Sequence, residues 1–462
     1  MRKEDSMGKE LLFQALRHEM PERVPWVPFA GVHAGKLKGY TAKEILLDED
    51  KLYESLMEVN RIYSPDGMPV LFDLQVEAEI LGCKLMWAEN NPPSVRKHPY
   101  MADGSGWPSD DKIPTPESGR IPMILNTMRR MKKSVGDETA LYGLVCGPFT
   151  LASHLRGSDI FTDMFMDKDY VHGIMEFCGK VCIKMCEYYI DAGMDVIAIV
   201  DPLMSQVSPE IIEEQLSQPF KDSFDYIRSR GVFSAFFVCG NATNQIEALC
   251  KTGPDSVHVD ENVDLAKAKE TTDKYNILIG GNIPLTTTML FGTQSENMKV
   301  ALEIMDSIKD KRNFILSPGC DMPYDVPIEN TVAITQAVLH PDETREMVKN
   351  YEAPVEDIEV DIPDYDNLKK VFIELFTLDP DQCAACTYMV RSVTDIYDEI
   401  KDDADYVVYR YNNKPDIART KKMQIPQLPT MVINGKPTFI SIIPSKAQLI
   451  EAIAKAKEEM KK

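Results

Sequence analysis

Apolar strands alternate with helical segments along most of this chain, and this alternation limits the possible fold more than any other feature. Eight strands are expected, each ending in a polar residue or a glycine. Eight parallel strands that alternate with helices form a (β/α)8 TIM barrel. We therefore expect a TIM barrel over residues 1–350. The expected strands are residues 23–29, 68–72, 141–146, 195–200, 232–238, 256–259, 277–280 and 314–316.

A doubly wound open sheet is the alternative to a barrel. Such a sheet usually carries a glycine-rich phosphate loop after its first strand. The sequence contains neither a G-x-G-x-x-G motif nor a Walker motif. The pattern therefore favours the barrel.

Polar side chains and two thiols follow the expected strands. TIM barrels place their reactive groups at the carboxyl ends of the strands. Cys239 and Cys320 both lie at such ends and could converge on one zinc ion, because thiolate is a ligand that zinc favours. The alternative is two ordinary buried cysteines. The residues expected at this end of the barrel are His33, Asp73, Asp201, Cys239, Asp260, Asn282 and Cys320.

The chain is strongly acidic, with a formal net charge of −22. An acidic surface repels phosphate backbones and anionic membranes, so we expect no nucleic-acid or membrane partner. The start of the sequence has no apolar leader, and no apolar run approaches membrane-spanning length. We therefore expect a cytoplasmic protein whose ten cysteines are reduced rather than arranged in a disulfide framework.

The composition changes after residue 350. Seven acidic residues and two prolines, without any base, lie between Glu352 and Asp366. This composition predicts an extended acidic linker over residues 351–366. A second domain over residues 367–462 then begins with an expected strand, and the Asn434-Gly435 pair predicts a hairpin further on.

Two motifs in this second domain resemble thioredoxin. They are Cys383-Ala-Ala-Cys386, between a strand and a helix, and Leu428-Pro429-Thr430 before the hairpin. The resemblance implies a thioredoxin-like α/β domain with a redox pair at Cys383 and Cys386 and a cis-proline at Pro429. A helix amino terminus stabilises the thiolate of the first cysteine. The alternative is a docking or structural domain with an inert dithiol, because Gln382, Ala384 and Ala385 replace the usual neighbours.

The amino-terminal domain resembles the uroporphyrinogen decarboxylase superfamily, and most closely its methylcobamide methyltransferase branch. That branch moves methyl groups between a corrinoid protein and a thiol, a small methyl donor or a folate. The resemblance therefore implies a methyltransferase. It is carried by the segments Gly147–Ala152, Asp201-Pro202 with Ser208–Glu210, Cys239–Thr243, Gly280–Pro284, and Ile315–Pro323 with Glu329-Asn330.

The sequence departs from the decarboxylases themselves. Their Arg-Gln-Ala-Gly-Arg loop, which holds a substrate with many carboxylates, corresponds here to Val32–Lys36 and has lost both arginines. Without them, bidentate carboxylate binding is lost. Cys320 replaces their histidine and His154 their tyrosine, whereas Asp73 matches their aspartate. A decarboxylase-like enzyme remains an alternative.

Zinc binding in the methyltransferase branch uses His-x-Cys and a later cysteine. Cys239 and Cys320 match the two cysteines, but Phe237 occupies the histidine position. Two protein ligands hold zinc too weakly, so a third must come from elsewhere. The third ligand stays open among His33, His154, Glu77, His258 and Asp260.

The resemblance also implies further roles at the open end of the barrel. We expect the corrinoid on a separate partner protein, because this chain has no Asp-x-His-x-x-Gly sequence for binding cobalamin. The other partner is a small methyl donor or acceptor. The expected catalytic residues are Asp73, His154, Asp201 and Asn241, and the expected substrate pocket contains His33, Glu77 and Asn282.

Two hypotheses give the second domain a different role. In the first, the barrel is a non-catalytic, redox-responsive binding module, and Phe237 marks the loss of catalysis. In the second, the dithiol of Cys383 and Cys386 keeps the zinc thiols or the corrinoid system reduced.

Overall fold

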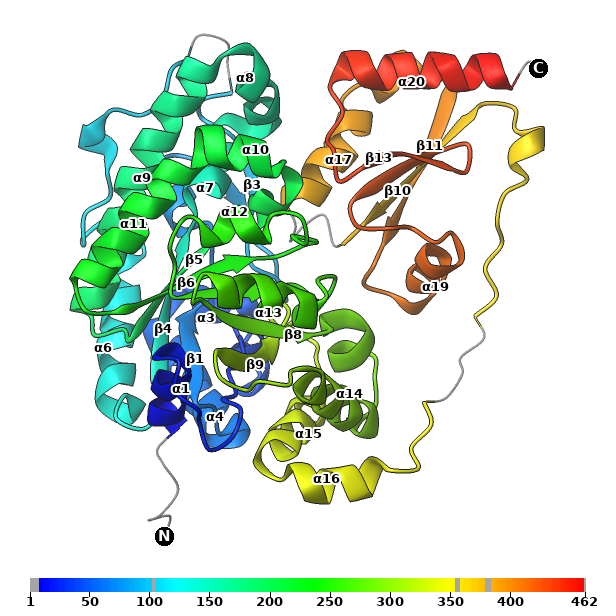
Figure 1. Cartoon of the computed structure of the whole chain (residues 1–462). Helices are drawn as coiled ribbons and strands as arrows, with labels where there is room; N and C mark the ends of the chain where they lie inside the picture. The colour runs from blue at the N-terminus through cyan, green and yellow to red at the C-terminus, as the bar shows by residue number, and fades with distance from the viewer. Residues whose placement is uncertain (1–7, 102–104, 354–357, 379–383, 461–462) are drawn as a thin grey trace. The chain divides into compact units, whose positions relative to one another are not determined.

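A computed structural model describes residues 8–101, 105–353, 358–378 and 384–460 (Figure 1). The chain divides into two compact units, Met1–Ala353 and Pro354–Lys462. Each unit has its own sheet. The boundary between them falls inside the segment expected to be the linker.

The first unit is built on a curled parallel sheet of seven strands with a TIM-barrel-like arrangement (Figure 1). The strand interiors are almost entirely buried and apolar, as expected for parallel strands covered on both faces. Each strand pairs only with its neighbours in this order. In sheet order they are β1 (Gly67–Leu71), β4 (Ala140–Cys146), β5 (Val196–Val200), β6 (Phe233–Val238), β7 (Ser256–Val259), β8 (Leu278–Ile283) and β9 (Phe314–Pro318).

The expected first strand, residues 23–29, is reduced to an isolated bridge between Trp26 and Leu316. The Val27 amide donates to the Leu316 carbonyl at 3.0 Å, and the Leu316 amide donates to the Pro25 carbonyl at 2.9 Å. On the other side, the Asp66 amide donates to the Trp26 carbonyl at 2.9 Å, directly before β1. The segment therefore joins the two edges of the sheet. Its prolines lack an amide donor, which prevents a continuous ladder.

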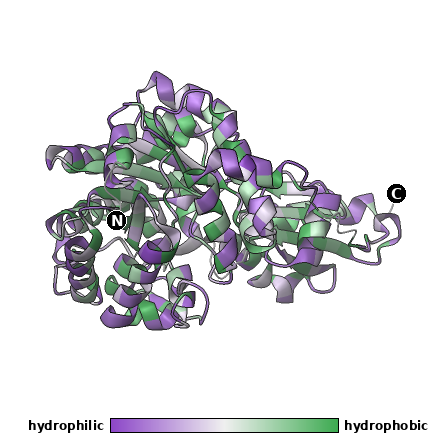
Figure 2. Cartoon of the chain, turned by 90° about the horizontal axis from the view of Figure 1, so that it is seen from below, coloured by the Kyte–Doolittle hydropathy of each residue, from purple (hydrophilic) through white to green (hydrophobic). Residues whose placement is uncertain are grey.

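Helices surround this sheet, and their outward faces are hydrophilic while the strands are apolar (Figure 2). In α9, Cys178, Cys182 and Cys186 lie on one face and are fully buried, as their spacing of four predicts. The longer helices are α1 (Gly8–Leu16), α4 (Glu49–Tyr63), α6 (Ile121–Val135), α7 (Pro148–Arg156), α9 (Lys168–Asp191), α11 (Ser217–Ser229), α13 (Leu265–Lys274), α14 (Gln294–Ser307), α15 (Ile328–Leu339) and α16 (Pro341–Val348).

Shorter elements fill the connections of the first unit. A two-stranded hairpin of β2 (Lys84–Met86) and β3 (Ser94–Lys97) lies between β1 and α6 in the chain. The short helices are α2 (His33–Lys36), α3 (Ala42–Leu47), α5 (Val76–Ile80), α8 (Ile160–Met166), α10 (Pro209–Ile211) and α12 (Ile246–Cys250).

Aromatic rings fill the inside of the curled sheet. The ring of Phe29 lies edge-on to those of Phe237, Tyr142 and Phe72, at centroid distances of 4.8, 5.7 and 6.4 Å. Ile315 belongs to the same buried cluster. The interior is therefore a packed core and not a channel.

The second unit has a four-stranded sheet in the order β11 (Ala404–Arg410), β10 (Val371–Thr377), β12 (Thr430–Ile433) and β13 (Lys436–Ile440). β10 and β11 are parallel, and the other pairs are antiparallel. Asn434 and Gly435 have positive φ, as a tight hairpin requires. The helices are α17 (Ala384–Thr394), α18 (Tyr397–Ile400), α19 (Lys414–Lys422) and α20 (Lys446–Glu459), the last of which begins with a capping box at Ser445.

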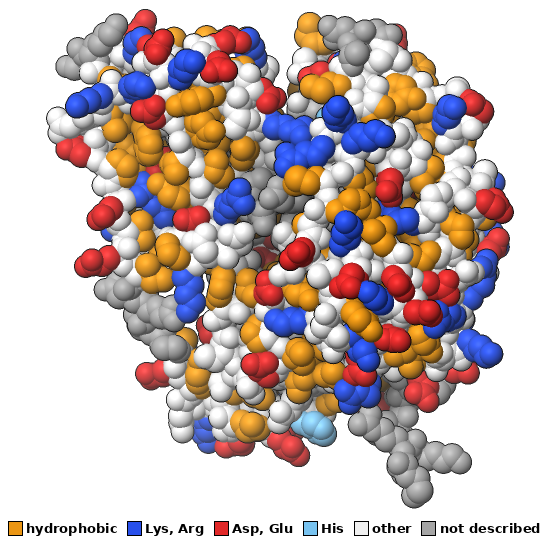
Figure 3. Space-filling view, turned by 180° about the vertical axis from the view of Figure 1, so that it is seen from behind, with side chains coloured by type: hydrophobic (Ala, Val, Ile, Leu, Met, Phe, Trp, Pro, Cys, Tyr) orange, Lys and Arg blue, Asp and Glu red, His pale blue; other side chains and the backbone are white. Residues whose placement is uncertain are grey.

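The face of the molecule seen in Figure 3 mixes charged side chains of both signs with apolar ones. Within the described ranges, none of the helices is both long and apolar enough to cross a membrane.

Candidate functional site

The structure brings Cys239 and Cys320 together at the carboxyl ends of their strands. Cys239 directly follows β6, and Cys320 lies two residues beyond β9. Their Cα atoms are 6.0 Å apart, and the two sulfurs form a disulfide. The convergence agrees with the strand-end argument, but the oxidised state differs from the expectation that all cysteines are reduced. Both side chains are partly exposed and pack against the barrel core.

Phe237 and His258 form the layer beneath this disulfide. Phe237 precedes Cys239 by two residues, on the same face of β6, and it pairs in register with His258 of β7. The two rings stack at 5.4 Å. Burial lowers the pKa of His258 to about 3, so its ring is neutral. Gly280 makes room for it, since a Cβ there would lie 2.2 Å from the His258 Nδ1.

The described residues do not fit a resident zinc ion. No group of three or more His, Cys, Asp or Glu side chains within the described ranges could hold a metal. Both sulfurs are bonded to each other, whereas zinc binds thiolates and needs at least three protein ligands in a catalytic site. None of the five candidates for the third ligand completes such a group with Cys239 and Cys320.

His33, a candidate for the pocket and for the metal, lies in α2 and is fully buried. Its Nε2 is 2.6 Å from the Tyr63 hydroxyl, and its Nδ1 is 3.1 Å from the Tyr324 carbonyl. The Tyr324 carbonyl can only accept, so Nδ1 carries the proton and Nε2 accepts from the tyrosine. Burial lowers the pKa of His33 to about 4. Both ring nitrogens are therefore occupied within the protein.

Asp73, an expected catalytic residue, lies just beyond β1 and forms a buried ion pair with Arg120. The Arg120 Nη1 lies 2.7 Å from an Asp73 oxygen, and its Nε lies 2.8 Å from Glu79. The guanidinium also lies over the ring of Trp87, 5.1 Å from its centroid. No local pattern indicates Arg120, because it lies directly before α6 and is 47 residues from Asp73 in the chain.

Glu77 and His154 are buried polar residues with unused hydrogen-bonding atoms. The Glu77 Oε1 accepts from the Cys146 amide at 3.2 Å, while Oε2 has no partner among the described residues. Burial raises the pKa of Glu77 to about 7. Both ring nitrogens of His154 in α7 also lack described partners, and burial lowers its pKa to about 3. These atoms can accept or donate a hydrogen bond to a bound molecule or a water.

Asp201, which follows β5, anchors the beginning of α7. Its carboxylate accepts from the amides of Phe149 at 2.9 Å and Thr150 at 3.0 Å, and from the Thr150 hydroxyl at 2.6 Å. Gly147 is required beside it, since a Cβ there would lie 2.3 Å from Asp201 Oδ2. Burial nevertheless raises the pKa of Asp201 to about 7. Its observed contacts position the Gly147–Thr150 turn.

Asn241 and Asn282, expected in catalysis and in the pocket, also bond within the protein. The Asn241 side chain accepts from the Thr243 amide and hydroxyl, at 3.2 and 2.6 Å. The Asn282 side chain donates to the carbonyls of Asp260 and Val263, at 2.9 and 2.8 Å. Both residues therefore shape the loops that follow β6 and β7.

Two carboxyls, Asp260 and Glu261, follow β7 beside the Cys320 turn. Asp260 accepts from the Asn262 amide at 2.9 Å, and its pKa is raised by burial. Glu261 packs against Gly319, where a Cβ would lie 2.8 Å from the Glu261 amide nitrogen. Burial, and then the charge of Asp260, raise the pKa of Glu261 to about 8, although its side chain remains partly accessible. Glu261 was missed, yet the strand-end rule that indicated Asp260 could have found it.

The expected redox residues of the second unit are only partly described. Cys386 is fully buried in the first turn of α17. Cys383 lies outside the described residues. Pro429 follows a cis peptide bond with Leu428.

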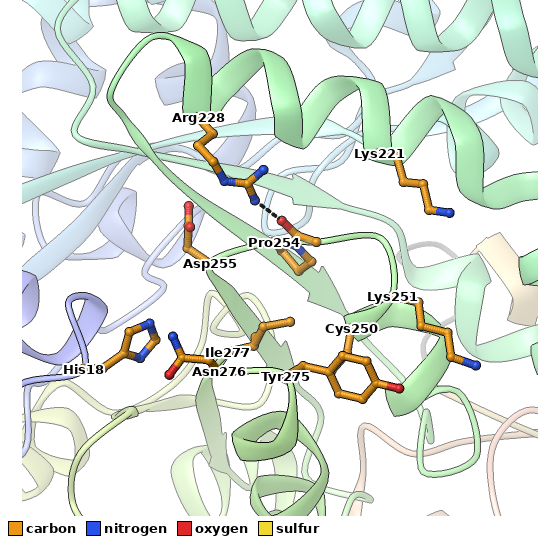
Figure 4. A pocket seen from close by; sticks show the side chains of 11 residues that line it. His18, Lys221, Arg228, Cys250, Lys251, Pro254, Asp255, Tyr275, Asn276 and Ile277 are labelled. Atoms are coloured by element: carbon orange, nitrogen blue, oxygen red, sulfur yellow. Dashed lines mark hydrogen bonds between the residues drawn. The ribbon is translucent and has the colours of Figure 1, made fainter.

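A cavity of about 660 Å³ opens at the other end of the strands (Figure 4). Asp255 and Ile277, which precede β7 and β8, line it together with Lys221, Arg228 and Lys251. Arg228 donates to the Gly253 carbonyl in this wall (Figure 4). Barrel enzymes place their chemistry at the carboxyl ends of the strands, so this cavity is not the candidate active site.

Comparison with known proteins gives a consistent family assignment. The family model described as uroporphyrinogen decarboxylase (URO-D) matches residues 7–340. The methylcobamide:CoM methyltransferase MtbA of Methanosarcina acetivorans is 27% identical over 333 residues, which cover 70% of this chain and 94% of that protein. A uroporphyrinogen decarboxylase of Wolbachia sp. subsp. Brugia malayi is 27% identical over 303 residues, covering 64% of this chain and 83% of that protein.

A solved structure, described as a methyltransferase from Methanosarcina mazei, has a similar fold. It aligns with a TM-score of 0.65 and 24% identity, covering 72% of this chain and 98% of that structure. The similarity supports the fold of the first unit.

Proposed function

The chain belongs to the uroporphyrinogen decarboxylase family, and on that premise we propose that it is a corrinoid-dependent methyltransferase. The methyl group would move between a corrinoid on a separate protein and a small thiol or other small methyl carrier. The similarity to MtbA, which extends over 94% of that protein, supports this branch of the family.

The acidic character of the carboxyl ends of the barrel strands favours methyl transfer over decarboxylation. Carboxyl side chains lie there, and Arg120 forms ion pairs with two of the acids of this region, Asp73 and Glu79. A substrate with many carboxylates needs free cationic partners, ideally arginine forks. The acids near the strand ends are Asp73, Glu77, Asp201, Asp260, Glu261 and Asp321.

Methyl transfer to a thiol requires a base. A thiolate would attack the methyl carbon, and the bond between that carbon and the partner's corrinoid would break, with its electron pair staying on the corrinoid. The thiol proton must therefore be removed first. Glu261 is suited to accept it, because burial raises its pKa to about 8, near neutral pH, while the residue stays partly exposed. In the reverse direction the same carboxyl returns the proton.

Other residues at this end would bind and orient the substrate. Glu77 and His154 offer buried polar atoms without described partners, which a substrate can satisfy. Asp201 holds the start of α7, the helix that contains His154, and Asn241 holds the loop that follows Cys239. The proposal uses no bound zinc, because the described residues do not form a metal site.

For the second unit we propose a thioredoxin-like fold. The supporting features are the mixed sheet in which β10 pairs in parallel with the edge strand β11, Cys386 in the first turn of α17, and the cis peptide before Pro429. Its cysteines would serve thiol–disulfide chemistry.

An anaerobic assay tests the methyltransferase. Methylcobalamin serves as the corrinoid substrate, several small thiols including CoM serve as acceptors, and demethylation is followed by absorbance. We expect wild-type protein to accelerate thiol methylation, and Glu261→Gln to slow it by roughly 10²-fold or more, as for loss of a general base. Glu213→Gln, an exposed partner of Lys251, is the matched control and should keep full activity.

A parallel assay for carbon dioxide release from a uroporphyrinogen tests the decarboxylase alternative. Turnover there, without demethylation of methylcobalamin by any thiol, would replace the proposal with a decarboxylase. A third outcome is that the chain is inactive in both assays while a corrinoid protein binds only its oxidised or only its reduced form. These two results together would favour the non-catalytic, redox-responsive barrel. The disulfide of Cys239 and Cys320 is the observation that supports this second candidate.

A further inference from the structure

Cys239 and Cys320 differ from the other described cysteines in their accessibility. Both are partly exposed, whereas Cys83, Cys250 and the remaining described cysteines are buried. Burial raises the pKa values of Cys83 and Cys250 to about 12, so these thiols are protonated and unreactive. Within the described residues of the first unit, cysteine chemistry with an external partner is therefore concentrated at Cys239 and Cys320.

The backbone holds these two residues at a separation that suits a disulfide. Their Cα atoms are 6.0 Å apart, inside the usual range of about 4.4–6.8 Å. The residues are 81 positions apart in the sequence, and each follows a buried strand of the barrel. The strands fix both loops, so the bond can break and form again with little movement of the backbone.

The surroundings favour a redox pair over a metal site. Phe237 occupies the position on the same face of β6 from which a third ligand would reach the sulfurs, and its ring is fully buried against Phe29 and His258. No third ligand is present among the described residues. Two partly exposed sulfurs above neutral aromatic rings can exist as a disulfide or as a dithiol.

We propose that Cys239 and Cys320 form a reversible redox pair at the open end of the barrel, reduced by a protein dithiol. A thiolate of that dithiol attacks one barrel sulfur, the Cys239–Cys320 bond breaks, and the released thiolate takes a proton from solvent. The second thiolate of the dithiol then resolves the mixed disulfide. The barrel pair gains two electrons and two protons, and the dithiol becomes a disulfide.

A dithiol of this class has two possible sources. One is the Cys383-Ala-Ala-Cys386 sequence of the same chain, in which Cys386 lies in the first turn of α17 and Cys383 lies outside the described residues. The other is a separate dithiol protein. The chemistry is the same for both. The proposal concerns the redox state of the barrel and does not depend on the methyl transfer proposed above.

Equilibration of the full chain in anaerobic dithiothreitol buffers of graded redox potential tests the pair. Free thiols are trapped with N-ethylmaleimide, peptides are identified by mass spectrometry, and zinc is measured in the same samples. We expect Cys239 and Cys320 to change together from linked to alkylated at one midpoint, with substoichiometric zinc in both forms. Cys250→Ser, a buried control, should leave that midpoint unchanged, and Cys320→Ser should keep Cys239 alkylated throughout.

Two results would overturn the redox pair. One is alkylation of both cysteines at every potential. The other is one zinc ion per reduced chain that is lost in Cys239→Ser and in Cys320→Ser. Neither measurement uses methyltransferase activity, so failure of the proposed function would leave the test intact.

The rate of reduction distinguishes the two sources. Glutathione, a monothiol, sets the baseline in a Cys383→Ser/Cys386→Ser variant. A faster rate in wild-type chain assigns the electrons to its own dithiol, and a faster rate only when a thioredoxin is added to the variant assigns them to a separate protein. Rates equal to the baseline in all arms would overturn the role of a protein dithiol.

Discussion

Phe237 and His258 stack ring on ring, 5.4 Å apart and nearly parallel, directly beneath the Cys239–Cys320 disulfide. Phe237 lies where the methyltransferase branch would place a histidine, and its neighbour in register is a histidine without a described partner for either nitrogen. The inside of the barrel therefore has an imidazole one strand away from the expected position. The position of a metal-binding histidine is therefore occupied by the ring of Phe237, which stacks on His258.

A histidine at position 237 should allow the reduced protein to bind zinc. In Phe237→His the new imidazole would lie two residues before Cys239, on the same strand face. Three protein ligands suffice for a zinc site with an open position. We expect the reduced variant to bind about one zinc ion per chain, as measured by elemental analysis, where the reduced wild type binds substoichiometric amounts.

Phe237→Leu is the matched control, since it changes the packing without adding a ligand. If that variant gained the same zinc, or if Phe237→His gained none, the missing histidine would not be what prevents metal binding.

Removing Arg120 should destabilise the first unit. Asp73 has a fully buried side chain, and Arg120→Met would leave its carboxylate without the 2.7 Å ion pair. Breaking a buried pair costs about 3–5 kcal/mol. We expect a loss of this size in the free energy of unfolding, measured by urea denaturation with tryptophan fluorescence.

The double variant Asp73→Asn/Arg120→Met serves as the control. Without a buried charge it should lose less stability than Arg120→Met alone. Equal losses of unfolding free energy in the two variants would mean that Arg120 stabilises the unit by packing on Trp87 and not by pairing with Asp73.

The sequence predicted the strands of the barrel well because parallel strands buried on both faces are continuous apolar runs. The expected run at residues 232–238 corresponds to β6, and that at 256–259 to β7. The expected strand at 23–29 has the same apolar character, but Pro25 and Pro28 remove amide donors, so only a bridge forms. A hydrophobic run thus identifies a buried segment, while hydrogen bonding decides whether it is a strand.

The candidate site was less predictable, because its contacts join distant parts of the chain. The strand-end rule placed Cys239 near Cys320, but no local pattern marks their oxidation state. Arg120 could not be found, since its partner Asp73 is 47 residues away. His33 follows an expected strand end, yet its ring bonds to Tyr63 and Tyr324. Side-chain direction in these loops depends on tertiary packing, which the sequence pattern does not contain.

Glu77 should make the stability of the first unit depend on pH. Burial raises its pKa from the usual 4.5 to about 7, so between these values the unfolded chain has lost a proton that the folded chain keeps. The contribution of Glu77 to the free energy of unfolding is therefore fully present below pH 4.5, falls as the pH rises toward 7, and changes little above pH 7. The fall due to Glu77 is on the order of 3 kcal/mol.

Glu77→Gln should remove this part of the pH dependence, because the amide is neutral at every pH. Urea denaturation between pH 4.5 and pH 8 measures it, and Asp201 contributes a fall of the same sign in both proteins, since its pKa is raised to about 7. Identical pH profiles for wild type and Glu77→Gln would show that Glu77 is ionised in the folded protein.

Loss of Arg419 should destabilise the second unit alone. Arg419 in α19 pairs with Glu374 of β10, and both side chains are buried. The Tyr365 hydroxyl donates to the other Glu374 oxygen at 2.5 Å. In Arg419→Met the carboxylate would keep only this tyrosine, and a buried charge left without its ionic partner costs about 3–5 kcal/mol.

The tryptophans allow the two units to be followed separately, because Trp26, Trp87 and Trp107 are all in the first unit. We expect Arg419→Met to leave the tryptophan fluorescence transition of wild type unchanged, while amides of β10 and β12 exchange faster by hydrogen–deuterium exchange. Glu374→Gln/Arg419→Met should restore part of the protection, since it removes the uncompensated charge. A shift of the tryptophan transition in Arg419→Met would mean that the two units unfold together, and the second unit could then not be treated as an independent carrier of the dithiol.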